Sequence, residues 1–324
     1  MTLVLAVDGG NSKTDLALVG GDGELVAFAR GSQSSPHHLG EDGCMRVLAE
    51  LVDEVGLDGR VASVATLCMA GVDFPREEDR LAELVRARGW AQSTTVLNDT
   101  FAVLRAGTED GWGVAVVCGA GINCVGIAPD GRQVRFPALG AITGDWGGGF
   151  DVGLAAVSKA ARSFDGRGRK TTLEHAVPGH FGLETPYELA EAIHRDEIAE
   201  RRVLELAPVV FTEAERDEVA AEIVDRLAAE VVSLASAALA RLGLEERSVE
   251  VLLGGGLLRG DDSRVVEGIR EGLRGRAPAA GVRVTGTPPV VGSALLALDA
   301  LGAPAAAQAR AREEVMAAAG VSDG

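Results

Sequence analysis

The sequence predicts an α/β protein built from two copies of one βββαβαβα unit. Three observations lead to this prediction. Apolar, strand-like runs recur between turn residues, amphipathic helical patterns alternate with the later strands, and the order of elements that begins at residue 3 begins again at Trp112. With 324 residues, 47% of them hydrophobic, the chain is long enough for two such units with cores of their own.

The first half is expected to span residues 1–111. Short turns rich in Gly and Asp separate its three opening strands, which favours an antiparallel meander. Apolar residues three and four apart, from Met45 to Val55, mark the first amphipathic helix. The expected strands are 3–8, 14–19, 25–29, 61–68 and 94–97, and the later helices are 77–88 and 100–106.

The second half is expected to span residues 112–302 and to contain a helical insertion that ends at Leu242. The acidic run from Glu213 to Glu222 is interpreted as the solvated face of one of its helices. An Ala-rich helix, 304–318, lies in the last segment, 303–324, with the first half as a candidate surface for its packing. The expected strands are 114–118, 123–128, 133–137, 249–253 and 282–285, and the helices outside the insertion are 152–163, 263–273 and 290–301.

Two ribonuclease H-like βββαβαβα halves that face each other across a cleft form the actin-like ATPase fold, in which a nucleotide lies between the halves. The formal net charge of -17 argues against a nucleic acid or an anionic membrane as partner, because an acidic surface repels both. The first ten residues lack the basic region of a signal peptide, so a cytoplasmic protein is expected. The four cysteines lack CxxC spacing and are expected to be buried free thiols.

Two glycine-containing turns between apolar strands are candidates for phosphate binding. Glycine lets a ligand approach the main chain, so the N–H groups at such a tip can form an anion-binding hollow. Either turn alone is also typical of an ordinary hairpin, and the presence of two favours the binding of a triphosphate. The candidate residues are Gly10, Asn11, Ser12, Lys13 and Thr14 in the first turn, and Gly119, Ala120 and Gly121 in the second.

Two carboxylates stand at the ends of strands in the first half. Asp8 ends the first strand, where it could hold Mg²⁺ through water. Asp99 follows a strand and opens a helix. It is either a helix cap or a general base that takes the proton of a sugar hydroxyl as that hydroxyl attacks the γ-phosphate. The two phosphate-binding turns favour the second interpretation.

Further candidates lie in the second half. Asp145 can accept hydrogen bonds from two adjacent sugar hydroxyls, and the Asn123 amide can donate and accept in the same pocket. Trp146 either stacks on a sugar face or fills an apolar gap. A strand is followed by three glycines that allow the close approach of an adenosine, Gly254, Gly255 and Gly256.

Seven stretches carry a family resemblance: DGGNSKT (8–14), CMAGVDFPREED (68–79), LNDTFAVLRAG (97–107), CGAGINCVGIAPDG (118–131), GDWGGG (144–149), LGGGLLR (253–259) and PPVVGSALLAL (288–298). Together, and in this order, they resemble the BadF-type branch of the actin-like ATPases. That branch contains the N-acetylglucosamine kinases and the activators of 2-hydroxyacyl-CoA dehydratases. The resemblance implies ATP and Mg²⁺ as cofactors, the site residues given above, and further substrate-binding positions at Ser35, Gly71 and Asn98.

The chain departs from the kinase pattern at several positions. Where those kinases usually show Thr and Ser in the second phosphate turn, this chain has Ala120 and Ile122. Trp146 replaces an acidic residue, Ser35 stands where an Asn often helps to bind the sugar, and Ala70 takes a place that is Ser in some members. These changes leave the phosphoryl-transfer residues in place and bear on recognition of the N-acetyl group.

The resulting hypothesis is an ATP-dependent kinase of a hexose or amino sugar. N-acetylglucosamine, phosphorylated at O6, is the leading substrate, followed by glucosamine, glucose and N-acetylmuramate. The relatives make a homodimer the expected assembly. The alternatives are an ATPase that activates a dehydratase of the 2-hydroxyacyl-CoA type and a non-catalytic sugar or nucleotide sensor. A glucokinase of the repressor-kinase group is disfavoured, because its Cys/His zinc cluster is missing.

Overall fold

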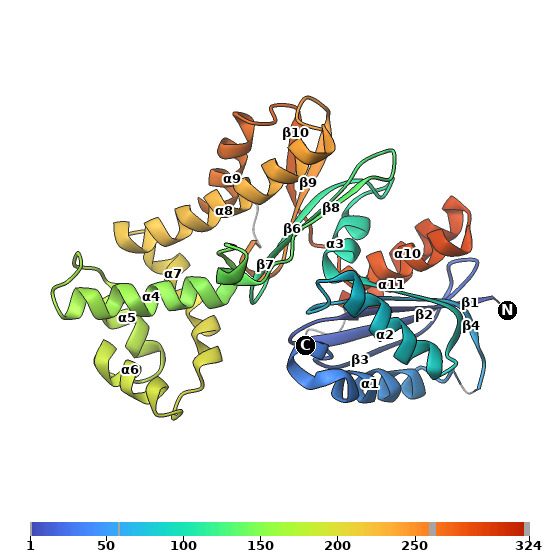
Figure 1. Ribbon diagram of the computed structural model, residues 1–324, viewed down its shortest axis with the longest axis horizontal. Coiled ribbons are helices and arrows are strands. Elements are labelled where there is room, and N and C mark those ends of the chain that lie inside the picture. Colours follow the sequence, from blue (N-terminus) through green and yellow to red (C-terminus); the bar gives the residue numbers. More distant parts are fainter. Residues whose placement is uncertain (1, 58, 259–263, 321–324) are drawn as a thin grey trace. The chain divides into compact units, whose positions relative to one another are not determined.

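The computed structural model describes residues 2–57, 59–258 and 264–320 (Figure 1). Ser263, which the sequence predicts to begin a helix, and residues 321–324 of the last predicted segment lie outside this description. Within the described ranges, no helix has the length and apolar character needed to cross a membrane.

The first sheet has five strands in the order β3-β2-β1-β4-β5. Strands β1 to β3 form the expected antiparallel meander, and β4 and β5 continue the sheet parallel to β1. The strands are β1 (Leu3–Gly9), β2 (Lys13–Gly20), β3 (Leu25–Ser32), β4 (Ala62–Met69) and β5 (Ala91–Asn98). The connecting helices are α1 (Pro36–Glu54), α2 (Pro75–Ala87) and α3 (Asp99–Gly107).

The second sheet has the order β10-β9-β6-β7-β8, which read backwards repeats the connectivity of the first. This confirms the predicted duplication of a βββαβαβα unit. Its strands are β6 (Gly113–Cys118), β7 (Ile122–Ile127), β8 (Gln133–Arg135), β9 (Val249–Gly254) and β10 (Ala280–Val284). Strands β7 and β8 are antiparallel, and β9 and β10 are parallel.

The expected insertion between β8 and β9 is helical (Figure 1). It contains α4 (Gly148–Phe164), α5 (Leu173–His180), α6 (Pro186–His194), α7 (Ala207–Glu213), α8 (Glu218–Leu242) and the 3₁₀ segments η1 (Gly140–Ile142) and η2 (Glu200–Leu206). After β9 follow η3 (Gly256–Leu258), α9 (Arg264–Arg274), α10 (Pro289–Leu301) and α11 (Ala305–Gly320).

Two sequence-based expectations for the region between β8 and β9 are wrong: the start of the helix expected at 152–163 and the interpretation of the acidic run in the insertion. Helix α4 begins at Gly148 rather than at residue 152, because the N–H groups of Gly149 and Phe150 in its first turn donate to the carbonyls of Gly119 and Ala120. The acidic run 213–222 is not one solvated helix face. Glu213 ends α7 as a buried side chain paired with Arg216, and Asp217 caps α8 by accepting from the Val219 and Ala220 N–H groups.

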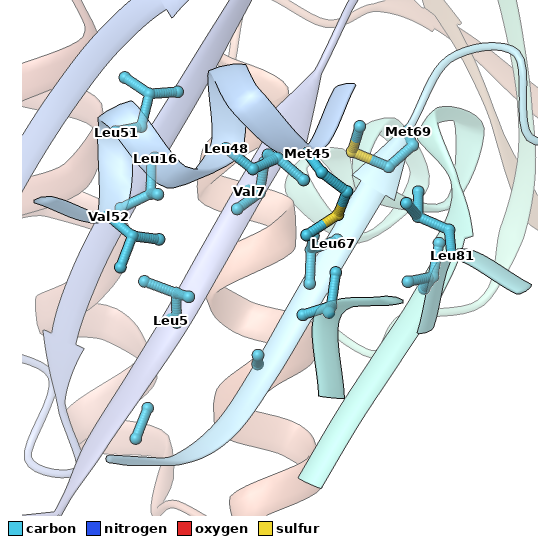
Figure 2. Packing of buried hydrophobic residues seen from close by; sticks show 14 of the residues in the cluster. Leu5, Val7, Leu16, Met45, Leu48, Leu51, Val52, Leu67, Met69 and Leu81 are labelled. Atoms are coloured by element: carbon cyan, nitrogen blue, oxygen red, sulfur yellow. The ribbon is translucent and has the colours of Figure 1, made fainter. Parts of the chain in front are cut away.

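Alternation along the strands gives the first sheet two apolar faces. On one face, Leu5, Val7 and Leu16 pack with α1 and with Leu67 of β4 (Figure 2). The other face is buried against residues from the end of the chain. Its members are Val4, Ala6, Ala17, Val19 and Val64 of the sheet, Val290, Val291, Ala294, Leu295, Ala297 and Leu298 of α10, and Ala311, Val315 and Ala319 of α11.

Polar contacts tie the last two helices to the same unit. Buried Arg105 of α3 pairs with Asp299 at 2.7 Å and donates to the Gln308 side chain. The Leu25 N–H donates to Glu314 of α11 at 2.7 Å. The last helix therefore packs on the first sheet.

Contacts divide the chain into two compact units. The first contains Met1–Ala115, Val125–Pro137 and Thr285–Gly324, and the second contains Val116–Cys124 and Ala138–Val284. The domain boundaries expected after residues 111 and 302 refer to the repeated halves and stay a prediction.

Candidate functional site

The first glycine turn connects β1 to β2 in the first unit. The Gly10 N–H donates to the Lys13 carbonyl at 2.9 Å, while the side chains of Asn11 and Ser12 at its tip are exposed. Below the tip, buried Thr14 donates to the Ser32 carbonyl and contacts the Ser34 hydroxyl, both at 2.7 Å. The turn is therefore fixed at its base and open at its tip, as a phosphate-binding turn must be.

Asp8 is the last residue but one of β1, next to this turn, and is partly buried. Burial, then the negative charges of Asp99 and Asp15, raise its pKa to about 8, while Lys13 and Arg30 act in the opposite direction. A carboxyl with such a raised pKa lies in surroundings that stabilise its charged form poorly. Because carboxylate oxygens are the ligands that Mg²⁺ takes from proteins, Asp8 fits the predicted magnesium contact.

Asp99 is the first residue of α3, and its side chain is partly buried. The N-cap of this helix is Asn98, whose side-chain oxygen accepts from the Thr100 N–H at 3.1 Å. The capping role that the sequence left open for Asp99 thus belongs to its neighbour. Burial raises the pKa of Asp99 to about 6, against the lowering effect of hydrogen bonds from the Thr100 and Asp99 backbone. A carboxyl whose pKa lies near 6 can accept a proton at neutral pH, which suits a general base.

Ser35 and Gly71, two predicted substrate-binding residues, lie together. A Cβ on Gly71 would come within 2.6 Å of the Ser35 Oγ. That Oγ is buried and has no hydrogen-bond partner among the described residues. Buried hydroxyls are rarely left unsatisfied, so this one is available for a ligand group or water that reaches it.

The second glycine turn, Gly119–Gly121, lies between β6 and β7 in the second unit. The first turn of α4 holds it from one side, because the N–H groups of Gly149 and Phe150 donate to the carbonyls of Gly119 and Ala120 at 2.8 and 3.0 Å. The N–H groups of Ala120 and Gly121 have no acceptor within the part of the chain that the structure describes. Carbonyls that point into the protein and unused N–H groups are what the predicted anion-binding turn requires.

The glycine stretches 144–149 and 254–256 pack against this turn and against Cys118, the residue that precedes it. A Cβ on Gly148 would lie 2.4 Å from the Gly121 carbonyl oxygen. A Cβ on Gly255 would lie 2.2 Å from the Cys118 carbonyl oxygen, and Gly255 has a φ of +91°. The sequence singled out residues 119–121, 144–149 and 254–256 separately, and the structure brings parts of all three together.

Asp145 and Asn123 complete the predicted sugar-binding set. The Thr143 hydroxyl donates to Asp145 Oδ2, and the Asp145 N–H donates to the Gly140 carbonyl at 3.0 Å. Asn123 follows the glycine turn and accepts from the Cys124 N–H through Oδ1 at 2.7 Å. Both side chains are partly buried. Their contact with a sugar stays a prediction.

Trp146 packs within the second unit. The Arg226 guanidinium stands 4.0 Å from the centre of its ring, a cation–π contact. The two line a half-open hollow of about 230 Å³ together with Ala155, Lys159, Glu222 and Ile223. This packing accounts for Trp146 without a sugar ligand.

Sequence reasoning missed one residue of the first unit. Asp73 lies in the loop between β4 and α2, is half-buried, and accepts from the Asn98 side chain at 3.0 Å. Burial, then the charge of Asp99, raise its pKa to about 7. The available signal was a carboxylate four residues after a buried strand, within the stretch CMAGVDFPREED.

Comparison with protein families decides what the chain is related to. The sequence model of the BadF/BadG/BcrA/BcrD ATPase family matches residues 5–297. The chain belongs to this family. The resemblance seen in the seven sequence stretches is thereby confirmed.

Two characterised relatives align with most of this BadF-type chain. The N-acetylmuramic acid/N-acetylglucosamine kinase of Clostridium acetobutylicum is 28% identical over 263 residues, 80% of this chain and 86% of the relative. The N-acetyl-D-glucosamine kinase of Dictyostelium discoideum is 26% identical over 321 residues, 92% of this chain and 98% of the relative.

Solved structures share the fold of this family member. A Chromobacterium violaceum protein provisionally named N-acetylglucosamine kinase has a TM-score of 0.69 at 22% identity, over 91% of this chain and 99% of that one. A ROK family glucokinase from Streptomyces griseus, in complex with glucose and AMPPNP, has a TM-score of 0.55 at 19% identity, over 92% and 99%. The likeness to such kinases confirms the predicted α/β fold of two duplicated halves.

Proposed function

We propose that the chain is an ATP-dependent kinase of an amino sugar or hexose, with N-acetylglucosamine as the leading substrate and O6 as the hydroxyl that is phosphorylated. The observation that carries the proposal is the environment of Asp99. Its carboxyl stands at the start of α3, leaves the capping role to Asn98, and has a pKa that burial raises to about 6, below the raised pKa values of Asp8 and Asp73. The names of the two relatives favour an amino sugar.

In the proposed reaction, Asp99 accepts the proton of the sugar hydroxyl as its oxygen attacks the γ-phosphorus. The bond between that phosphorus and the bridging oxygen of ADP breaks, and ADP leaves with the electron pair. The N–H groups of both glycine turns bind phosphate oxygens. Asp145, Asn123 and Ser35 orient the sugar, and Gly254 to Gly256 admit the adenosine. Asp8 would hold Mg²⁺, which would supply charge neutralisation on the phosphates.

The rival hypothesis of a dehydratase activator requires cysteines able to hold an iron–sulfur cluster. All four cysteines of this chain are buried, and burial raises the pKa of the Cys44 and Cys68 thiols to about 12. Such thiols resist forming the thiolates that bind iron. These observations favour the kinase.

The test is a phosphorylation screen. Purified protein with ATP and Mg²⁺ is offered N-acetylglucosamine, glucosamine, N-acetylmuramate, glucose and N-acetylmannosamine, and ADP release is compared with the sugar-free rate. Phosphorus–proton correlation in the product identifies the phosphorylated oxygen. If no sugar raises ADP release above the background of ATP hydrolysis, the proposal fails and the sensor hypothesis gains. We also propose that the protein is a cytoplasmic homodimer. Sedimentation analysis tests its oligomeric state.

A further inference from the structure

The loop between β4 and α2, residues 70–74, is fixed on one side by the turn that contains Ser35. Its Ala70 N–H donates to the Gly9 carbonyl at 2.7 Å, and a Cβ on Gly71 would meet the Ser35 Oγ at 2.6 Å and the His37 Cβ at 2.9 Å. No side chain larger than glycine fits there without displacement. The loop is therefore packed against candidate substrate-binding structure.

On its other side the same loop holds Asn98. The Asn98 Nδ2 donates to the Val72 carbonyl at 3.1 Å and to Asp73 Oδ1 at 3.0 Å. The Asn98 Oδ1 accepts from the Thr100 N–H at 3.1 Å and from the Thr100 hydroxyl at 2.6 Å. Both amide hydrogens and both lone pairs of this buried side chain are thus used within the protein. The residue predicted to bind substrate acts here as a clamp between the loop and α3.

The loop is itself held rigidly. The N–H groups of Asp73 and Phe74 both donate to Glu77 Oε2, at 2.9 and 3.1 Å. The next residue, Glu78, accepts from the Asn98 N–H at 3.2 Å and pairs with Arg135 at 2.7 Å. Asn98 is therefore held through its backbone by Glu78 and through its side chain by Asp73.

We propose that Asp73 is a positioning residue for phosphoryl transfer. Asp73 accepts a hydrogen bond from the Asn98 side chain and thereby fixes the first turn of α3. Because Asp99 is the first residue of that turn, the same bond sets the direction of the Asp99 carboxylate. The inference rests on the proposed function, because it assigns Asp99 as the base. An amide that has lost one acceptor gains freedom to rotate, and an error of about 1 Å in the placement of a reacting group can cost about a hundredfold in rate.

The hydrogen bond requires an acceptor at residue 73 and does not require a charge. A carboxylate, a carboxylic acid and a primary amide all offer a carbonyl-type oxygen to the Asn98 side-chain Nδ2–H. Asp73→Asn should therefore preserve the clamp, while Asp73→Ala removes it. Asp79→Asn is the matched control, because it removes a carboxylate from an exposed position of α2, six residues further along the chain.

The experiment combines steady-state kinetics with hydrogen exchange on the full-length variants, using the sugar that the wild type phosphorylates best. We expect Asp73→Ala to lower kcat roughly ten- to hundredfold, with KM for sugar and ATP changed less than about threefold. Hydrogen exchange in the segment 98–107 should become faster. Asp73→Asn and Asp79→Asn should stay within about threefold of wild type in kcat and show the wild-type exchange pattern.

Three results would overturn the proposal. One is a wild-type kcat in Asp73→Ala, and another is equal loss in the Asn and Ala variants. A third is a rise in KM for the sugar in both variants with unchanged exchange, which would mean that Asp73 contacts the sugar. If Asp73→Ala does not fold, Asn98→Asp removes the same hydrogen bond from its donor side, together with the one to the Val72 carbonyl, and should lower kcat by at least as much. If the wild type phosphorylates no sugar, the proposed function fails, and the exchange data still decide whether Asp73 fixes the turn.

Discussion

Gly255 approaches Cys118 so closely that a Cβ on Gly255 would lie 2.2 Å from the Cys118 carbonyl oxygen. The same residue has a φ of +91°, a region that side chains with a Cβ rarely adopt. We expect Gly255→Ala to lower the free energy of unfolding by about 2 kcal/mol or more, because backbone strain and a steric clash add. Urea denaturation measures the change. Gly256→Ala is the control, since nothing lies within 4 Å of a Cβ there, and it should cost far less. Equal costs for the two would mean that the strand can shift to relieve the clash.

Replacing Asp99 tests the general base directly. We expect Asp99→Asn to lower kcat by roughly two to four powers of ten with unchanged ATP affinity. The helix should remain intact, because Asn98 supplies its cap. Sugar phosphorylation rates and calorimetric titration with a non-hydrolysable ATP analogue give the two quantities. A variant that phosphorylates sugar at the wild-type rate would remove Asp99 from the mechanism.

Ala120 lies in the second glycine turn, where related kinases carry a hydroxyl. The N–H groups of Ala120 and Gly121, which have no acceptor among the described residues, are backbone groups, so phosphate binding there does not depend on the side chain. Ala120→Thr should change kcat/KM for the sugar by less than about tenfold, since a neutral hydrogen bond contributes about 0.5 to 1.5 kcal/mol. A gain of a hundredfold or more would show that the missing hydroxyl limits the enzyme.

Asp8 gives the protein a pH dependence in magnesium-free buffer. Its pKa is raised from 3.8 to about 8 in the folded state, first by burial and then by the charges of Asp99 and Asp15. The neutral form is thus favoured by folding, so its contribution to stability is complete below about pH 4 and is lost as the pH rises towards 8. The stability of the wild type relative to Asp8→Asn should fall over that range. Denaturation curves in chelator at several pH values test this, and a constant difference would contradict the raised pKa.

Magnesium should reverse that loss if Asp8 is the metal contact. A cation that binds the folded state alone raises its stability by mass action. At pH 8 we expect added Mg²⁺ to raise the midpoint of thermal unfolding more in the wild type than in Asp8→Asn. An equal rise in both proteins would place the ion elsewhere.

The duplicated topology could be predicted from the sequence because it depends on local pattern. Strands such as β1 and β6 are apolar runs that end in glycine turns, and these signals lie within ten residues of one another. Asp99 could be chosen for the same reason, since a carboxylate between a strand pattern and a helix pattern can be recognised from the sequence alone.

Features that depend on distant partners could not be predicted. Asp73 gains its role from Asn98, 25 residues away, and no spacing rule links the two. Glu213 looks like its acidic neighbours in the sequence, yet its burial depends on the geometry at the end of α7. Gly148 opens α4 with a φ of +74° and lies so close to the Gly121 carbonyl that a Cβ there would come within 2.4 Å of its oxygen, a contact with a residue 27 positions away in the chain.

The packing of α10 and α11 on the first sheet has a consequence for biosynthesis. A ribosome makes residues 289–320 well after the strands of the first sheet, yet Val290, Leu295 and Leu298 cover those strands. Until those helices leave the exit tunnel, Val4, Ala6 and Val19 lack their apolar partners, and such exposed surfaces attract chaperones and aggregate. A nascent chain stalled after residue 284 should therefore stay sensitive to protease in its first hundred residues, however completely the insertion helices have folded.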